Sequence, residues 1–244
     1  MVPALEEILA ATKSMVFFGG AGVSTESGIP DFRSVDGLYH QKFKYPPETM
    51  LSHTFYETHT AEFFDFYRQK LIVHGAKPNA AHLRLAALER EGKCRAVVTQ
   101  NIDGLHQAAG SKTVYELHGS TLRNYCTRCG KFFPVQFIED AAGVGDGVPR
   151  CDECGGIVKP DVVLYEEGLD EETMENAVHA IRGADTLIVG GTSLAVYPAG
   201  LLRYFRGENL VVINKQPTPA DAMANLLIHA PIGRTLDPDA PVEV

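Results

Sequence analysis

Residues 15–33 read MVFFGGAGVSTESGIPDFR, and this stretch decides the fold. Its apolar start, residues 15–18, is typical of a buried strand, and the glycines that follow let the backbone approach a ligand because they have no Cβ. Backbone N–H groups in such a turn bind pyrophosphate, so the stretch predicts a dinucleotide site. Because Gly20-x-Gly22 is followed by Thr25 instead of a third glycine, a purely structural turn stays open as an alternative.

The end of the same stretch favours the binding site over the structural turn. Asp31 supplies a carboxylate, Phe32 an aromatic ring and Arg33 a guanidinium that pairs with anions. A turn with only a structural role has little use for this combination. We therefore expect these three residues to contact a bound dinucleotide.

Length and charge limit the classes of protein. The chain has 244 residues and a formal net charge of −9 at pH 7, and this length suits one α/β unit with a smaller insertion. The negative charge does not attract nucleic acid or anionic lipid, so we expect neither as a partner, whereas basic peptides are compatible. No apolar run is long enough to span a membrane and no signal peptide is recognised, so a cytoplasmic location is expected.

Apolar and helical segments alternate along the chain. Short apolar runs predict buried parallel strands at 15–18, 96–99, 186–189 and 210–213. Helical patterns lie at residues 3–14, 79–91, 171–182 and 199–205. This alternation predicts an α/β fold, a doubly wound parallel sheet of the Rossmann-like type.

Two blocks interrupt the alternation. Residues 35–77 are rich in aromatic side chains and histidine, with a helix expected over 58–73, and residues 123–159 contain four of the five cysteines. We expect these two insertions to form a small lobe. The Rossmann-like domain would then comprise residues 1–34, 78–122 and 160–244.

The four clustered cysteines have the spacing of a zinc ribbon: Cys126-x-x-Cys129, then 21 residues, then Cys151-x-x-Cys154. Four thiolates complete a tetrahedron and leave no position for water, so we expect one structural zinc ion. Two disulfides are the alternative, which a cytoplasmic chain does not favour. Cys94 stands apart beside a predicted strand, where an ordinary buried thiol is expected.

Polar or glycine-rich segments follow the predicted strands, at 20–33, 99–103, 190–193 and Asn214. Ligands of open α/β sheets bind beyond the carboxyl ends of the strands, so these segments should line one crevice. The second segment, TQNID, contains two amides and a carboxylate; a polar loop in which Asp103 caps a helix is the alternative.

One histidine has a position that suggests chemistry. His118 follows the strand-like run 114–117 and should lie at the mouth of the crevice, where a neutral imidazole can accept a proton near pH 7. The others considered are expected to be structural; they are His53, His59, His82 and His106.

Taken together and in this order, the motifs resemble those of the sirtuins, the NAD-dependent protein deacylases. The resemblance rests on Gly20-Ala21-Gly22-x-Ser24, 28–33, 99–103, His118-Gly119 and the cysteine pairs, and extends to 77–79, 160–165, 191–193 and 196–198. It implies removal of acetyl or other uncharged acyl groups from protein lysines, with nicotinamide, O-acyl-ADP-ribose and free lysine as products. The co-substrate would be NAD, the metal one structural zinc ion and the partners acyl-lysine proteins or peptides, and no oligomer is required.

The resemblance also implies roles for individual residues. His118 would accept a proton from the ribose hydroxyls, and Asn101 would act on the nicotinamide ribose; these are the two catalytic residues. The cofactor-binding set would be Gly20, Ala21, Gly22, Thr25, Asp31, Phe32, Arg33, Gln100, Asn101, Ile102, Asp103, Gly191, Thr192, Ser193, Asn214 and Ile232. An extended substrate peptide would pair between loops 163–167 and 194–198, with contacts from His118, Val163, Leu164, Tyr165, Val196 and Tyr197.

The pocket for the acyl group is expected to be apolar. Sirtuins that prefer succinyl-lysine have a Tyr-x-x-Arg pair in the helical insertion, and the resemblance puts Phe64 and Tyr67 at these positions. Arg68 lies one position further and should point away, since a helix turns about 100° per residue. Succinyl-lysine is therefore expected to be a poor substrate.

The chain departs from the family pattern at three places. Gly19 replaces a common threonine, Glu166 stands where a glycine is usual, and residues 227–235 match poorly. Two other functions stay open, a protein mono-ADP-ribosyltransferase and a non-enzymatic sensor of NAD or ADP-ribose. The presence of both Asn101 and His118 favours deacylation.

Overall fold

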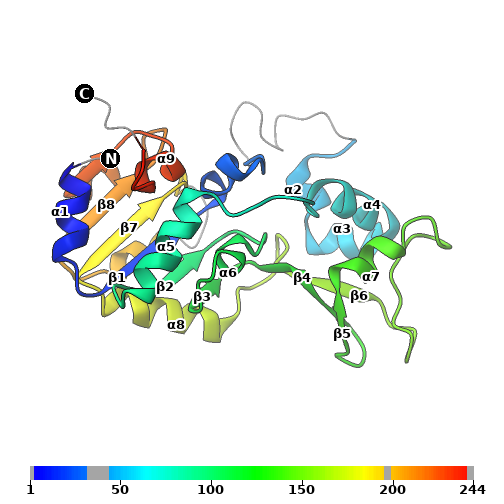
Figure 1. Ribbon diagram of the computed structural model, residues 1–244. Helices are drawn as coiled ribbons and strands as arrows, with labels where there is room; N and C mark the ends of the chain where they lie inside the picture. Colours follow the sequence, from blue (N-terminus) through cyan, green and yellow to red (C-terminus); the bar gives the residue numbers. More distant parts are fainter. Residues whose placement is uncertain (1–2, 32–43, 195–198, 241–244) are drawn as a thin grey trace.

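The structure is a computed structural model that describes residues 3–31, 44–194 and 199–240. Its larger part is built on a six-stranded parallel sheet with strand order β3-β2-β1-β7-β8-β9 (Figure 1). The strands are β1 (Met15–Gly19), β2 (Cys94–Thr99), β3 (Val114–Glu116), β7 (Thr186–Gly190), β8 (Asn209–Ile213) and β9 (Leu226–Ile228). The predicted doubly wound α/β fold is confirmed.

Helices cover both faces of this sheet, which explains why its strands are apolar throughout. Val16 and Phe18 face one hydrophobic cluster, and Met15 and Phe17 face the other, because successive side chains of a strand point to opposite faces. The first cluster is closed by α8 (Glu171–Arg182) and the 3-10 helix η4 (Ala199–Tyr204). The second is closed by α1 (Pro3–Ala11), α5 (Ala80–Arg90) and α9 (Ile232–Leu236).

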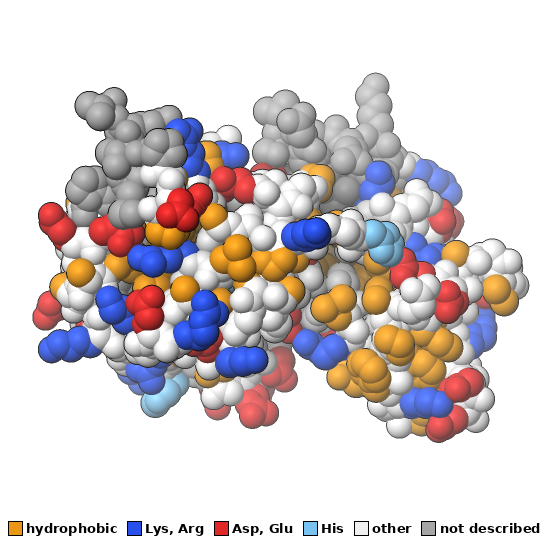
Figure 2. Space-filling model, viewed as in Figure 1, with side chains coloured by type: hydrophobic (Ala, Val, Ile, Leu, Met, Phe, Trp, Pro, Cys, Tyr) orange, Lys and Arg blue, Asp and Glu red, His pale blue; other side chains and the backbone are white. Residues whose placement is uncertain are grey.

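The smaller part contains an antiparallel sheet of order β5-β4-β6. Its strands are β4 (Gly119–Cys126), β5 (Phe132–Pro134) and β6 (Val158–Val162), next to α7 (Val135–Asp140). Phe63, Phe64 and Tyr67 of the helical insertion share one hydrophobic cluster with Phe133 and Ile138. Hydrophobic side chains also gather on the surface over this sheet (Figure 2), and Leu122, Tyr125 and Phe132 are its large exposed hydrophobic residues.

The domain boundaries expected at 122/123 and 159/160 fall inside β4 and β6. These strands therefore run continuously from the edge of the large sheet into the smaller part. The assignment of residues to two domains stays a prediction.

Several elements differ from the sequence prediction. The single helix expected at 58–73 is α4 (Thr60–Lys70), preceded by the short helices α2 (Pro47–Met50) and α3 (His53–Thr58). The break between α3 and α4 lies at His59, whose ψ of 44° is not helical. The segment expected to be helical over 199–205 is a 3-10 helix, and β9 and α9 occupy the poorly matching stretch near the C-terminus.

Among the described residues, no helix combines the length and the apolar character that crossing a bilayer demands.

Candidate active site

The candidate site lies at the topological switch point of the large sheet, where the strand order changes direction. From β1, the chain adds β2 and β3 on one side, and later adds β7, β8 and β9 on the other. A crevice outside the carboxyl ends of β1 and β7 is the expected ligand position for such a sheet. The segments that follow four of these strands are the ones singled out in the sequence.

The loops after β1 and β7 lie in direct contact. The backbone N–H of Gly22 donates a 2.8 Å hydrogen bond to the carbonyl of Gly191, whose φ is +58°. A Cβ on Gly22 would lie 2.8 Å from the Cα of Gly191, and one on Gly20 would lie 2.9 Å from the Cβ of Thr192. Larger residues at positions 20 and 22 would therefore push the loops apart, so the glycine turn has a structural role. The N–H groups of Gly20 and Gly22 are bonded to the carbonyls of Gly190 and Gly191.

Ser24 connects the loop after β1 to the loop after β2. Its hydroxyl donates a 2.6 Å hydrogen bond to Oδ2 of Asp103 and accepts one of 3.1 Å from Nδ2 of Asn101. The side chains are well buried, with Ser24 1% and Asn101 8% exposed. Asp103 also accepts a hydrogen bond of 2.9 Å from the backbone N–H of Leu105, the first residue of α6 (Leu105–Ala108). The N-cap position of this helix is Gly104, so Asp103 is not its N-cap residue, and the role of Asp103 in the site stays a prediction.

Ser24 is the site residue that the sequence reasoning missed. It belongs to the motif Gly20-Ala21-Gly22-x-Ser24, but the motif alone gave no function to its hydroxyl. The available signal was its type, since a buried serine needs a hydrogen-bond partner.

A hydrogen bond to one ring nitrogen of His118 fixes which nitrogen carries the proton. Its Nδ1 lies 3.0 Å from the carbonyl oxygen of Gln100, and a carbonyl only accepts, so the proton is on Nδ1 and Nε2 has a free lone pair. Burial lowers the pKa of His118 below its usual value, although the bond to Gln100 opposes this shift. The imidazole is therefore neutral near pH 7 and can take a proton on Nε2.

Two contacts fix the loop that carries Ser24. The side-chain amide of Asn79, at the N-cap of α5, donates to the carbonyl of Val23 at 2.7 Å and to the hydroxyl of Ser27 at 3.0 Å. The carboxylate of Glu26 accepts hydrogen bonds from the backbone N–H groups at the start of α9. The 3-10 turns of this loop are thus tied to two helices from other parts of the chain.

Two of the histidines expected to be structural, His82 and His106, lie in the interior of the protein. His82 accepts from the backbone N–H of Asn79 in the capping box of α5. The buried ring of His106 lies 4.7 Å from that of His82, and burial lowers the pKa of both. His53 and His59 lie on the surface of the helical insertion.

Most of the expected cofactor residues lie at the carboxyl edge of the large sheet. These are Gly20, Ala21, Gly22, Thr25, Gln100, Asn101, Ile102, Asp103, Gly191, Thr192, Ser193 and Asn214, and Asp31 is the last described residue of its loop. Ile232 is 2% exposed and packs in α9 against Gly190. Phe32, Arg33, Val196 and Tyr197 lie outside the described residues, and the roles of all these residues stay predictions.

The loop 163–167 is fastened to the helical insertion. The carbonyl of Tyr165 accepts from the N–H of His53 at 2.9 Å, and the N–H of Tyr165 donates to the carbonyl of Leu51 at 3.0 Å. At the other side, the N–H of Val163 donates to the carbonyl of His118 at 3.1 Å. The loop 163–167 thus connects the helical insertion directly to His118, which follows strand β3 in the chain.

Glu166 stands where a glycine is usual in the family, and its side chain makes hydrogen bonds that a glycine cannot make. Its φ is +76°, a conformation that favours glycine. Its carboxylate accepts from the backbone N–H of Thr54 at 2.9 Å and from the hydroxyl of the same residue at 2.7 Å. A negative charge at the N-terminus of α3 is favourable, so the glutamate holds the loop against this helix in a way that a glycine does not.

The two positions of the expected acyl pocket are fully buried. Phe64 and Tyr67 are both 0% exposed. The guanidinium of Arg68 instead donates to the carbonyl of Gly147 at 2.9 Å and to that of Ile138 at 3.4 Å. Arg68 is thus engaged with main-chain carbonyls, and its orientation relative to a bound acyl group stays a prediction.

The four expected metal ligands come together at the tip of the smaller part. The Sγ atoms of Cys126, Cys129, Cys151 and Cys154 all lie within 4.8 Å of one another. Two of the separations are 3.3 and 3.7 Å, close to the ~3.8 Å edge of a tetrahedron with Zn–S bonds of about 2.3 Å. The cluster suits one zinc ion, whereas Cys94 is a buried thiol whose pKa burial raises to about 12.

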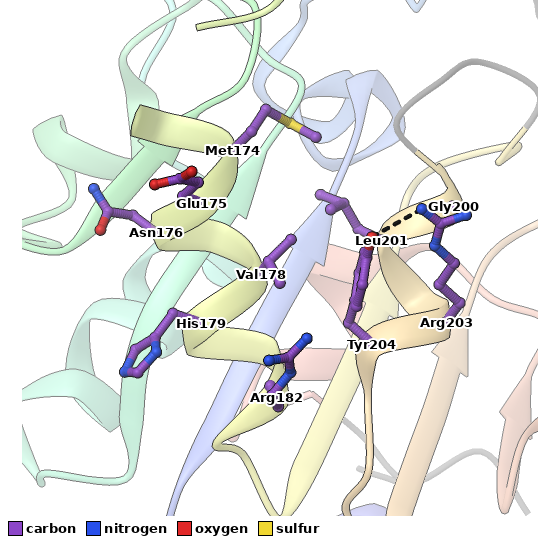
Figure 3. A pocket seen from close by; sticks show the side chains of 10 residues that line it. All are labelled: Met174, Glu175, Asn176, Val178, His179, Arg182, Gly200, Leu201, Arg203 and Tyr204. Atoms are coloured by element: carbon purple, nitrogen blue, oxygen red, sulfur yellow. Dashed lines mark hydrogen bonds between the residues drawn. The ribbon is translucent and has the colours of Figure 1, made fainter. Parts of the chain in front are cut away.

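A large hollow of about 640 Å³ lies elsewhere, between α8 and η4 (Figure 3). Arg203 donates to the hydroxyl of Tyr204 at 2.8 Å, and the guanidinium of Arg182 lies 5.7 Å from the same ring (Figure 3). None of the residues expected in the active site lines this hollow.

The sheet order, the contact between the loops and the hydrogen-bonded Ser24–Asn101–Asp103 group define a dinucleotide-binding α/β protein with a four-cysteine metal site. The family model of the Sir2 family matches residues 20–198, and the chain belongs to this family. An NAD-dependent protein deacetylase of Clostridium acetobutylicum is 61% identical over 236 residues, 96% of this chain and 95% of that protein.

Solved structures agree with this family. A complex of Sir2 with a p53 peptide and NAD+ has a TM-score of 0.85 at 37% identity and covers 97% of this chain and 95% of that chain. Sir2Tm bound to a propionylated peptide has a TM-score of 0.84 at 36% identity, with coverage of 96% and 94%.

Proposed function

We propose that this chain removes acetyl groups from lysine side chains of proteins and uses NAD as co-substrate. The observation that carries the proposal is the hydrogen-bonded group Asn101–Ser24–Asp103 at the strand ends, next to a neutral His118. The 61% identical relative is named an NAD-dependent protein deacetylase, and one structural neighbour holds both a peptide and NAD+.

The loops at the strand ends would bind NAD and prepare the nicotinamide bond for cleavage. Ala21, Ile102 and the carboxylate of Asp103 would contact the nicotinamide, while Gln100 and Asn101 hold its ribose. Because Ser24 fixes both Asn101 and Asp103, it would keep the groups on the ring and on the sugar in one relative position. Such positioning accounts for a large part of the catalysis of a displacement reaction.

The remaining expected contacts concern the rest of the cofactor. Residues after β7 and β8 would bind the phosphates and the second ribose; they are Gly191, Thr192, Ser193 and Asn214. Phe32 would exclude water from the reacting carbon, and Arg33 would pair with phosphate. Gly20, Gly22, Thr25, Asp31 and Ile232 would complete the cofactor site.

His118 would act after the amide oxygen of the acyl-lysine has displaced nicotinamide. Its Nε2 accepts a proton from a ribose hydroxyl, and the 2′-oxygen then attacks the imidate carbon. His118 would return this proton to the lysine nitrogen, which leaves as the free amine. Water would then add to the acyl carbon and break its bond to the 1′-oxygen, so that the acyl group ends on the 2′-oxygen of ADP-ribose. The fixed Nδ1 proton supports this role, because it keeps the accepting lone pair on Nε2.

The substrate protein would pair as an extended strand with loop 163–167 and with residues 194–198. Main-chain pairing tolerates many sequences, so we expect several lysine sites on cytoplasmic proteins, with uncharged acyl groups preferred. One chain supplies all the residues named, so no oligomer is needed, and the net charge of −9 gives no attraction for nucleic acid.

The test is incubation of the protein with NAD and an acetyl-lysine peptide, followed by mass spectrometry of all products. O-acetyl-ADP-ribose, nicotinamide and the deacetylated peptide in equal amounts support the proposal. Transfer of ADP-ribose to a protein acceptor without deacetylation would identify a mono-ADP-ribosyltransferase. NAD binding with no product would identify a sensor.

A further inference from the structure

A second hollow, which we term the α3 groove, lies beside the loop proposed to pair with substrate. It measures about 420 Å³ and lies between α2, α3 and the loop 163–167. The residues that determine its chemistry are Tyr45, Glu48, Phe55, His59, Tyr165 and Glu166. Of these residues, only Tyr165 was expected above to contact substrate, and no role was given to the hollow itself.

Aromatic rings form one part of its lining. The rings of Phe55 and His59 are stacked, with centroids 4.7 Å apart, and the ring of Tyr45 packs edge-on against Phe55 at 5.4 Å. The Nζ of Lys44 already lies 5.0 Å from the centroid of the Tyr45 ring while it pairs with Glu62 at 3.1 Å. The aromatic lining is therefore compatible with a nearby cation.

Carboxylates supply the charge of the groove. Glu48 is exposed in the first turn of α2, and Glu166 is fixed by its two bonds to Thr54. The hydrogen bonds from Thr54 lower the pKa of Glu166, so this group is ionised at neutral pH. Among the described residues that line the groove there is neither lysine nor arginine. Two negative charges beside aromatic rings match a guanidinium or an ammonium group.

The position of the groove relates it to the substrate. Tyr165 and Glu166 line the groove and also belong to the loop 163–167, with which the substrate peptide would pair. A peptide paired with this loop would pass the groove at a fixed number of residues from its acyl-lysine, because strand pairing fixes the register. We propose that the α3 groove binds an arginine or lysine side chain of the substrate protein at one such position. This inference rests on the proposed deacetylase function.

The experiment uses acetyl-lysine peptides in an alanine and glycine background, with one arginine moved through the three positions on each side. Deacetylation gives kcat/KM, and fluorescence anisotropy of the labelled peptides gives binding without NAD. We expect one position at which arginine raises kcat/KM and affinity several-fold over alanine. Glu48→Gln should reduce this advantage by about two- to five-fold, the range of one exposed ion pair.

The control is Glu57→Gln, which removes the same charge from α3 outside the lining of the groove. It should leave the advantage unchanged, and Glu48→Lys should abolish it. An equal gain from arginine at every position would indicate general attraction to a negative protein and would overturn the inference. So would an advantage that survives both Glu48→Gln and Glu166→Gln. Deacetylation of the arginine-free peptide tests the proposed function separately.

Discussion

The hydroxyl of Ser24 and the carboxylate of Asp103 form a 2.6 Å hydrogen bond between residues 79 positions apart in the chain. The same hydroxyl accepts from the amide of Asn101. One buried side chain thus fixes the loops after β1 and β2 relative to each other. It is the contact on which the proposed arrangement of the nicotinamide site depends.

Ser24→Ala is therefore expected to impair catalysis. It leaves the Asn101 amide and one oxygen of Asp103 without this partner, and an unpaired buried polar group costs about 1–3 kcal/mol. We expect kcat/KM for NAD to fall by roughly 10- to 100-fold, with zinc content unchanged. Ser27→Ala is the matched control, since its hydroxyl contacts Asn79 and not Asp103. Equal losses in both variants would show a general disturbance of the loop.

His118→Ala should remove deacetylation and leave NAD binding intact. The imidazole is assigned to proton transfer, and loss of a general base reduces rates by about 10² to 10⁴. Burial lowers the pKa of His118, so its neutral, active form persists below the usual titration range. Activity should stay level near neutral pH and fall only as the pH drops below about 6.5, the ordinary histidine value. A rate that rises as the pH falls would contradict the role of His118 as a base.

Loss of zinc should unfold the smaller part of the molecule and abolish activity. Metal binding at a four-thiolate site contributes directly to folding free energy, and the four Sγ atoms lie within 4.8 Å of one another. We expect one zinc per chain by elemental analysis, and none after Cys126→Ser. Cys94→Ala, outside the cluster, should retain the ion. Full activity of metal-free protein would refute the structural role.

Variants of Glu166 should separate its backbone strain from its side-chain contacts. Glu166→Ala keeps a non-glycine residue at φ +76° and loses the bonds to Thr54, whereas Glu166→Gly loses the bonds and relieves the strain. Thermal unfolding should therefore place the alanine variant below the glycine variant. The reverse order would mean that the positive φ carries no strain at this position.

The preference of the enzyme among acyl groups should be determined by the buried side chains of Phe64 and Tyr67. A succinyl carboxylate would be buried there without a guanidinium, because Arg68 binds the carbonyls of Ile138 and Gly147. Burying an unpaired charge costs several kcal/mol, so succinyl-lysine should have a kcat/KM at least ~100-fold below acetyl-lysine. The double substitution Phe64→Tyr and Tyr67→Arg should narrow this gap. Competition among acetyl, butyryl and succinyl forms of one peptide measures it.

The sequence by itself determined the features whose signals are local. Apolar runs predicted β1, β2, β7 and β8, because strands covered by helices on both faces are apolar throughout. The spacing of the two cysteine pairs predicted the metal cluster, since each pair forms one knuckle of the chain.

Contacts between distant segments were decided only by the tertiary structure. The helical insertion divides at His59, and β9 and α9 form in a stretch with weak resemblance to the family. Ser24 meets Asp103, and Glu166 meets Thr54 across 112 residues. No local pattern encodes these pairs, because each depends on where packing places two separate loops, and a hydroxyl or carboxylate has the same sequence signal whichever partner it finds.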